Sequence, residues 1–167
     1  MKVILVSDTS VLIDLERGGL LDPCFKLPFV FVVPDILYER ELANYGGPAL
    51  VERGLRVEEL TANEVRIAQD TRGAHPRLSL PDAFAFSLAS ARGWTLLTGD
   101  GELRTIAQNQ GMTFFGVLWV LDQLSYGQVV EGDLLAAGLD AILRHPRCRL
   151  PRAEAHARME RYRKGSV

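Results

Sequence analysis

The chain has 167 residues, which suits one domain with at most a small appendage. Hydrophobic residues make up 47% and charged residues 24%, an ordinary balance for a soluble globular protein. Cys24 and Cys148 stand far apart in no metal-type spacing, which excludes a disulfide framework or zinc site and fits a reducing cytosol. The apolar run after Met1 is too short for a signal peptide, so we expect a cytoplasmic protein.

Strands and helices are predicted to alternate along the first half of the chain. Residues 3–6 form a continuous apolar run with polar neighbours, which is typical of a buried strand in a parallel sheet. The elements predicted next are a helix over 10–16, a strand over 29–33, a helix over 35–44 closed by Gly46-Gly47-Pro48, and a strand over 55–60.

The second half continues this alternation and then turns helical. Thr61 and Glu64 resemble a capping box, and Ser79 with Pro81 resembles a helix start. The elements predicted here are helices over 61–71 and 83–92, a strand over 94–98, a helix up to 110, a strand over 112–117, and helices over 118–124, 132–143 and 151–163.

This order predicts a three-layer α/β/α fold with a central, mostly parallel sheet. No strand is evident after Tyr126-Gly127, so we expect a domain over residues 1–125 and a basic helical C-terminal extension over 126–167, packed on the domain or extending from it. From Arg144 onward the chain carries a charge of +6, against −8 for everything before it.

Acidic residues recur where the predicted strands end. Asp8 follows the first strand, Asp100 follows the fourth, and Asp82 opens the helix that leads into the fourth. Glu39 and Glu41 lie on the helix after the second strand. Because ligands gather beyond the carboxyl ends of parallel strands, we expect four chain-distant carboxylates to converge at one edge of the sheet.

Such a cluster predicts a divalent cation. Neighbouring carboxylates raise each other's pKa, and Mg²⁺ or Mn²⁺ relieves this repulsion because both prefer carboxylate oxygen and water. No histidine or cysteine spacing competes, since His75, His145 and His156 are isolated and expected at the surface. Carboxylates with Mg²⁺ suit phosphate chemistry, in which the metal activates a water and stabilises the leaving oxygen.

Each acid also has a purely structural interpretation. Asp8 suits a helix N-cap, Asp82 suits the acidic partner of a capping box with Ser79, and Asp100 suits a turn within Thr-Gly-Asp-Gly. The helix-borne glutamates suit a solvated face, and Asp14 is expected to face solvent from its helical phase. The placement of the acids after the right strands, in one architecture, favours the functional interpretation.

Four segments carry a family resemblance: VSDTSVLIDL (6–15), VVPDILYEREL (32–42), LSLPDAFAFSLA (78–89) and LLTGDGEL (96–103). Together they resemble PIN-domain nucleases, in particular the VapC-like toxins of prokaryotic toxin–antitoxin systems. The resemblance spans roughly residues 1–125, about three quarters of the chain. It implies that Asp8, Asp82, Asp100 and a glutamate on the helix after the second strand hold the metal.

The resemblance leaves the identity of the glutamate open. Glu41 with Leu42 matches the usual acid-then-apolar pair, but the spacing from Pro34 fits Glu39 nearly as well. Residues two apart on a helix point about 200° apart, so only one of them can enter the site, and we favour Glu41.

Three further positions match the family in part. Thr98 matches a hydroxyl residue two before the last acid, and Ser10 matches a small polar position near the first. Glu102 stands where relatives often carry another aspartate.

The resemblance implies an Mg²⁺- or Mn²⁺-dependent endoribonuclease that cleaves RNA and leaves a 5′-phosphate. It further implies a homodimer and an antitoxin protein that plugs the site. The alternative is a catalytically inactive PIN-like module that binds RNA or protein, against which the full set of acids argues. A Rossmann or P-loop nucleotide binder is not expected, because no glycine-rich phosphate loop follows the first strand.

Binding of RNA requires local positive charge, because the acidic body repels it. The arginines near the proposed acids in sequence are Arg40, Arg72, Arg77 and Arg104. The C-terminal extension adds Arg144, Arg147, Arg149, Arg152, Arg158, Arg161, Arg163 and Lys164. We hypothesise that this extension contacts RNA or a partner chain; a solvated amphipathic helix is the alternative.

Overall fold

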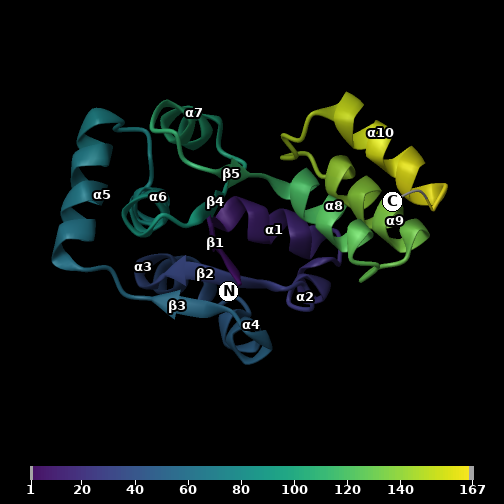
Figure 1. The fold of residues 1–167 in the computed structure, drawn as a ribbon, viewed down its shortest axis with the longest axis horizontal. Helices are drawn as coiled ribbons and strands as arrows, with labels where there is room; N and C mark the ends of the chain where they lie inside the picture. The colour runs from purple at the N-terminus through teal and green to yellow at the C-terminus, as the bar shows by residue number, and fades with distance from the viewer. Residues whose placement is uncertain (1, 166–167) are drawn as a thin grey trace.

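A parallel sheet forms the centre of the computed structural model, which describes residues 2–165 (Figure 1). Its strands run in the order β3-β2-β1-β4-β5. Their bounds are β1 Val3–Ser7, β2 Phe29–Pro34, β3 Arg56–Glu58, β4 Thr95–Leu97 and β5 Phe114–Phe115. The chain moves outward from β1 to β3 and then crosses back to β4, so the strand order switches between β1 and β4. The predicted three-layer α/β/α fold is confirmed.

Helices cover both faces of this sheet. The helices before the crossover from β3 to β4 are α1 Thr9–Arg17, α2 Leu21–Cys24, α3 Asp35–Leu37, the π-helical turn η1 Tyr38–Leu42 and α4 Gly47–Arg53. The crossover contains α5 Ala62–Ala74 and α6 Leu80–Arg92, and α7 Gly101–Asn109, α8 Val117–Tyr126, α9 Gly132–Arg144 and α10 Arg152–Arg163 follow β4. In Figure 1, α5, α6 and α7 lie toward one end of the molecule and α8, α9 and α10 toward the other.

Two hydrophobic clusters form the core, one on each face. Successive strand residues point to opposite faces, so Leu5 and Leu97 enter one cluster while Val6 and Leu96 enter the other. The first cluster contains side chains from α1, α8, α9 and α10, and the second contains those of α5, α6 and α7. This two-sided burial explains why the strands read as continuous apolar runs.

Predicted helix ends agree with the structure at two caps. Thr61 and Glu64 form the reciprocal capping box, with Thr61 N–H donating to Glu64 Oε1 at 2.8 Å and Glu64 N–H donating to Thr61 Oγ1 at 3.2 Å. Ser79 caps α6 by accepting from the N–H of Asp82 at 3.1 Å.

The region after β2 differs from the single helix predicted over 35–44. There α3 passes into η1, in which the N–H of Ala43 donates to Tyr38 O, five residues earlier, at 2.7 Å. Gly46-Gly47-Pro48, predicted to end a helix, instead begins α4. Proline suits a first helical turn because it lacks the N–H that would stay unpaired there. The short helix α2 was not predicted.

The last two helices pack on the domain. Tyr162 of α10 is 1% exposed and joins the cluster on the α1 face, with Met159 and Leu139. The carboxylate of Asp122 in α8 accepts hydrogen bonds from Arg158, Arg161 and Tyr162, at 2.6 to 3.2 Å. The division of the chain near residue 126 stays a prediction. No helix within residues 2–165 is long and apolar enough to cross a membrane.

Candidate active site

Asp8 lies where β1 ends and α1 begins. Its N–H donates to Leu97 O at 2.9 Å, which continues the ladder between β1 and β4. Its Oδ1 accepts from the N–H of Val11 at 3.0 Å and the hydroxyl of Ser10 at 2.8 Å, and its Oδ2 accepts from Thr98 Oγ1 at 2.5 Å. Asp8 is therefore the predicted N-cap, and the same carboxylate is held in a fixed orientation at the sheet edge.

Thr98 connects the two aspartates that follow the central strands. It is fully buried, donates to Asp8 and accepts from the N–H of Asp100 at 3.0 Å. Asp100 caps α7 by accepting from the N–H of Leu103 at 3.0 Å. The hydroxyl of Ser10 accepts from Gly99 N–H at 3.3 Å, which joins the loops after β1 and β4 a second time.

Glu41 and Asp82 approach from the neighbouring helices. Asp82 lies in the first turn of α6, and Glu41 lies in η1, where it accepts a hydrogen bond from the hydroxyl of Thr9. Glu39 is exposed and is not among the residues that line the cavity described below. The structure thus places Glu41, and not Glu39, beside Asp8.

A cavity of about 360 Å³ lies between the loops after β1 and β4. Five carboxylates line it, of which four come from separate segments of the chain, as predicted: Asp8, Glu41, Asp82 and Asp100. The cavity therefore sits at the switch in strand order, where open parallel sheets bind their ligands.

Burial raises the pKa of three of these carboxylates, and repulsion from Asp8 adds to the rise at Glu41 and Asp82. Burial raises the pKa of Asp8, against the opposing hydrogen bonds from Thr98, Val11 and Ser10. Burial and then the charge of Asp8 raise the pKa of Glu41, against Arg40.

Asp82 is shifted by the same causes. Burial, followed by the charge of Asp8, raises its pKa to about 7, and Asp100 and Glu41 add to the rise while Ser79 opposes it. The cavity is thus a place where a positive ion is stabilised.

The donor chemistry fits a hard divalent cation. All four carboxylates offer oxygen, and no histidine or cysteine lines the cavity. Within residues 2–165, no three His, Cys, Asp or Glu side chains stand close enough together to hold a metal as they are placed. Mg²⁺ usually keeps several waters and takes one or two protein carboxylates, so this arrangement suits Mg²⁺ better than an ion that needs a complete protein cage.

Four charged residues on the cavity wall were not predicted to lie there: Asp14, Arg17, Arg147 and Arg149. Asp14 was expected to face solvent, but it lines the cavity and lies 3.6 Å from Arg17. Arg147 and Arg149, from the loop between α9 and α10, line it as well. Their position depends on how the C-terminal helices fold back, which no local pattern reports.

A second, larger cavity of about 820 Å³ adjoins the first and shares Ile13, Arg17 and Glu41 with it. Its wall comes from α1, η1 and α4 and includes the exposed side chains of Ile13 and Tyr45.

Comparison with known proteins places this architecture in a family. A family model described as a PIN domain matches residues 4–164, which include both C-terminal helices. No curated protein matches the chain. PIN domains are generally nucleases, and the carboxylate-lined cavity at the switch point agrees with that activity. The chain therefore belongs to the PIN-domain family.

Proposed function

We propose that the protein is a metal-dependent endoribonuclease. The observation that carries this proposal is the convergence of Asp8, Glu41, Asp82 and Asp100 on one cavity of a PIN domain. These carboxylates come from four elements that are far apart in the chain, and their shared placement has no purely structural purpose. Capping explains Asp8 and Asp100 individually, but it does not explain the cluster.

One or two of the four carboxylates would hold Mg²⁺ or Mn²⁺ directly, and the others would contact waters that the ion retains. When bound, such an ion lowers the pKa of a bound water and offsets negative charge on a phosphate group. Thr98 and Ser10 orient Asp8 by donating to different oxygens of its carboxylate. Thr98 also accepts from Asp100 N–H, so the two aspartates keep a fixed relation while substrate binds.

We further propose that the protein is the toxin of a toxin–antitoxin pair, active as a homodimer and inhibited by an antitoxin. The larger cavity supports an inhibitory protein partner, because Glu41 belongs to both cavities. A partner side chain that entered the larger one would reach a proposed metal ligand. Co-expression with the product of a small DNA-binding gene upstream, followed by co-purification and loss of toxicity, tests this role.

The experiment for the nuclease itself uses a mixed RNA pool. The purified protein is incubated with Mn²⁺, with EDTA, and as Asp8→Asn or Asp100→Asn. We expect cleavage only by the unmodified protein with Mn²⁺, and products with 5′-phosphate ends. Asp140→Asn, on the solvent side of α9, is the matched control and should cleave normally. Cleavage in EDTA, or full activity in both site variants, would contradict the mechanism.

A further inference from the structure

The eight basic residues of the C-terminal extension are not equivalent. Arg158 and Arg161 are engaged with Asp122, and Arg144 pairs with Asp140 at 2.9 Å. Arg152 donates to the carbonyl of Leu143 at 3.5 Å. Within the described part of the chain, the basic side chains of the extension without an ion pair or side-chain hydrogen bond are Arg147, Arg149, Arg163 and Lys164.

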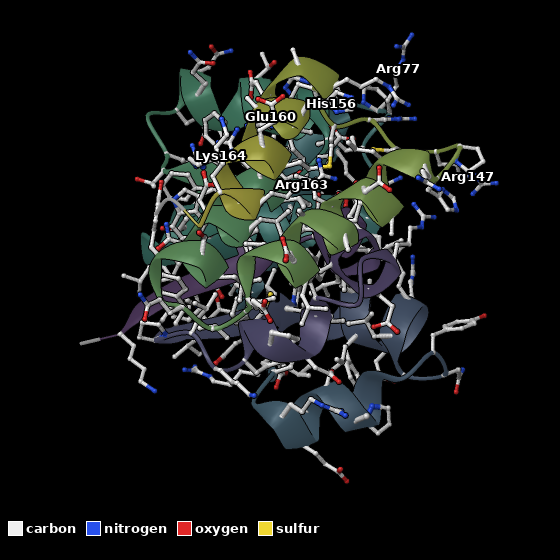
Figure 2. The ribbon with its side chains drawn as sticks, turned by 90° about the vertical axis from the view of Figure 1, so that its right-hand side faces the viewer. Arg77, Arg147, His156, Glu160, Arg163 and Lys164 are labelled. Atoms are coloured by element: carbon white, nitrogen blue, oxygen red, sulfur yellow. The ribbon has the colours of Figure 1, made fainter. Side chains whose placement is uncertain are left out.

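These four residues divide into two pairs by position. Arg147 and Arg149 line the cavity that holds the carboxylates, whereas Arg163 and Lys164 do not. Figure 2 shows Arg147 at one edge of the molecule, well away from Arg163 and Lys164. All four are exposed, so their difference lies in what they face.

The loop that carries Arg147 and Arg149 has a defined conformation. Arg147 N–H donates to His145 Nδ1 at 3.1 Å, and Leu150 N–H donates to Cys148 Sγ at 3.4 Å. Cys148 and Leu150 pack against the core. Side chains therefore alternate along residues 147–150: Cys148 and Leu150 face the core, and the exposed Arg147 and Arg149 face the cavity.

Both ends of this loop are also anchored. It begins at the end of α9, whose Leu139 and Ile142 are fully buried. It ends at Pro151, which precedes α10, and the carboxylate of Asp122 in α8 holds α10 through Arg158 and Tyr162. Arg147 and Arg149 therefore line the cavity in the folded protein, and no further conformational change is needed to bring them there.

We propose that Arg147 and Arg149 form a phosphate-binding arm of the active site, which holds the backbone of single-stranded RNA against the carboxylates. This inference rests on the proposed nuclease function. Five carboxylates line the cavity, and of the other cations on its wall Arg17 pairs with Asp14, which leaves Arg104. This wall repels a polyanion, so productive binding needs further cations beside it. Guanidinium groups bind phosphate oxygens through paired N–H donors, and arginine keeps its charge at any working pH.

The test compares two double variants that remove equal charge from the same extension. Arg147→Gln/Arg149→Gln removes the arm, and Arg163→Gln/Lys164→Gln is the matched control. Binding of a fluorescein-labelled, mixed-sequence single-stranded RNA is followed by anisotropy over a series of KCl concentrations. Both double variants also carry Asp8→Asn and are measured in EDTA, so that the RNA is bound but not cleaved.

We expect the arm variant to weaken binding at least about tenfold at low salt. It should also lower the slope of log K against log salt by about 1.4, since each phosphate contact to a single strand contributes about 0.7. The control pair should change binding less than about twofold. Equal losses in the two variants would overturn the proposal, because they would show a nonspecific effect of net charge. Should the double variant lose its far-UV circular dichroism, the two single variants carry the same comparison.

Cleavage of the mixed RNA pool with Mn²⁺ is measured separately, with proteins that keep Asp8. This measurement distinguishes failure of the arm proposal from failure of the nuclease proposal. If only the arm variant binds RNA more weakly and the unmodified protein does not cleave, the arm proposal holds and the nuclease proposal is contradicted. If the unmodified protein cleaves and both double variants bind RNA equally weakly, the nuclease proposal holds and the arm proposal is contradicted. Faster cleavage by the arm variant would also overturn the proposal, since it would show that the arginines neutralise the carboxylates and block the site.

Discussion

The contact between α8 and α10 depends on one carboxylate, and Asp122→Asn should test its contribution to stability. Asp122 is 7% exposed and accepts from Arg158, Arg161 and Tyr162. The substitution keeps the shape of the side chain but removes its charge and replaces one acceptor oxygen with an NH₂ group. If the remaining oxygen keeps Arg161 and Tyr162, the NH₂ group faces the donor of Arg158.

The expected loss follows from the burial of each donor. The Tyr162 hydroxyl keeps a neutral acceptor in place of a charged one, which costs about 1 kcal/mol at this buried position. Arg158, 24% exposed, loses a charge-assisted bond worth about 1.5–3 kcal/mol but regains part of it from solvent. Arg161, at 39% exposed, contributes about 1 kcal/mol or less. We therefore expect the free energy of unfolding to fall by about 3 kcal/mol.

Urea unfolding followed by circular dichroism measures this loss. A chain of this size should also show a Tm lower by about 6–12 °C. Asp140→Asn is the control, because its partner Arg144 is 80% exposed and the pair should contribute less than about 0.5 kcal/mol. Tyr162→Phe should cost more in the unmodified protein, about 1–2 kcal/mol, than in Asp122→Asn, whose neutral oxygen is the weaker acceptor. A loss below about 1 kcal/mol for Asp122→Asn, or an additive double-mutant cycle, would refute the reasoning.

Three further results are expected. Thr98→Val should abolish most cleavage and cost about 1–3 kcal/mol in urea unfolding, because Asp8 loses its buried donor, whereas Thr98→Ser should retain both activity and stability. Hydrogen bonds from Arg92 hold the pKa of Glu64 at about 2, below its ordinary 4.5. The ionised carboxylate therefore stabilises the folded state fully above pH 4.5, and this contribution is lost as the pH falls toward 2. The unfolding free energies of the unmodified protein and Glu64→Gln should accordingly differ by about 2 kcal/mol at pH 7 and converge by pH 2; a gap that stays constant over that range would exclude this ion pair as its source. Excess MnCl₂ should raise the Tm of the unmodified protein by about 5–10 °C, near saturation of one site, and clearly less for Asp82→Asn; equal shifts would place the metal elsewhere.

Several parts of the fold could be predicted because they depend on local patterns. The buried strands carry unbroken apolar runs, and Thr61, Ser79 and Pro81 fix their helix starts through backbone chemistry within one turn. The gathering of Asp8, Asp82 and Asp100 was also predictable, since strand order in a parallel sheet decides which loops meet. Their roles as metal ligands stay a prediction.

Other parts depend on tertiary contacts that no local pattern reports. The helix α4 begins at Gly47, whose α-hydrogen faces the backbone of Leu42 and the ring of Tyr38, so a close approach rather than helix propensity selects glycine there. Gly46-Gly47-Pro48 looks like a helix end because both of its residue types are breakers. The placement of Arg147 and Arg149 depends likewise on a distant contact, that of Asp122 with α10.

The π-helical turn η1 holds one residue more than an α-helix needs between its two buried leucines. Bonding to the fifth residue brings Leu37 and Leu42 to one buried face, although five residues in an α-helix would separate them by about 140°. Loss of the single codon for Arg40 would restore four-residue spacing and keep both leucines buried. The glutamate after it would still directly precede Leu42 and would turn by far less than the 100° that separates neighbouring residues of an α-helix. A three-nucleotide deletion at this codon should thus leave the carboxylate facing Asp8, whereas loss of the codon for Glu41 makes the same change in spacing and removes the carboxylate.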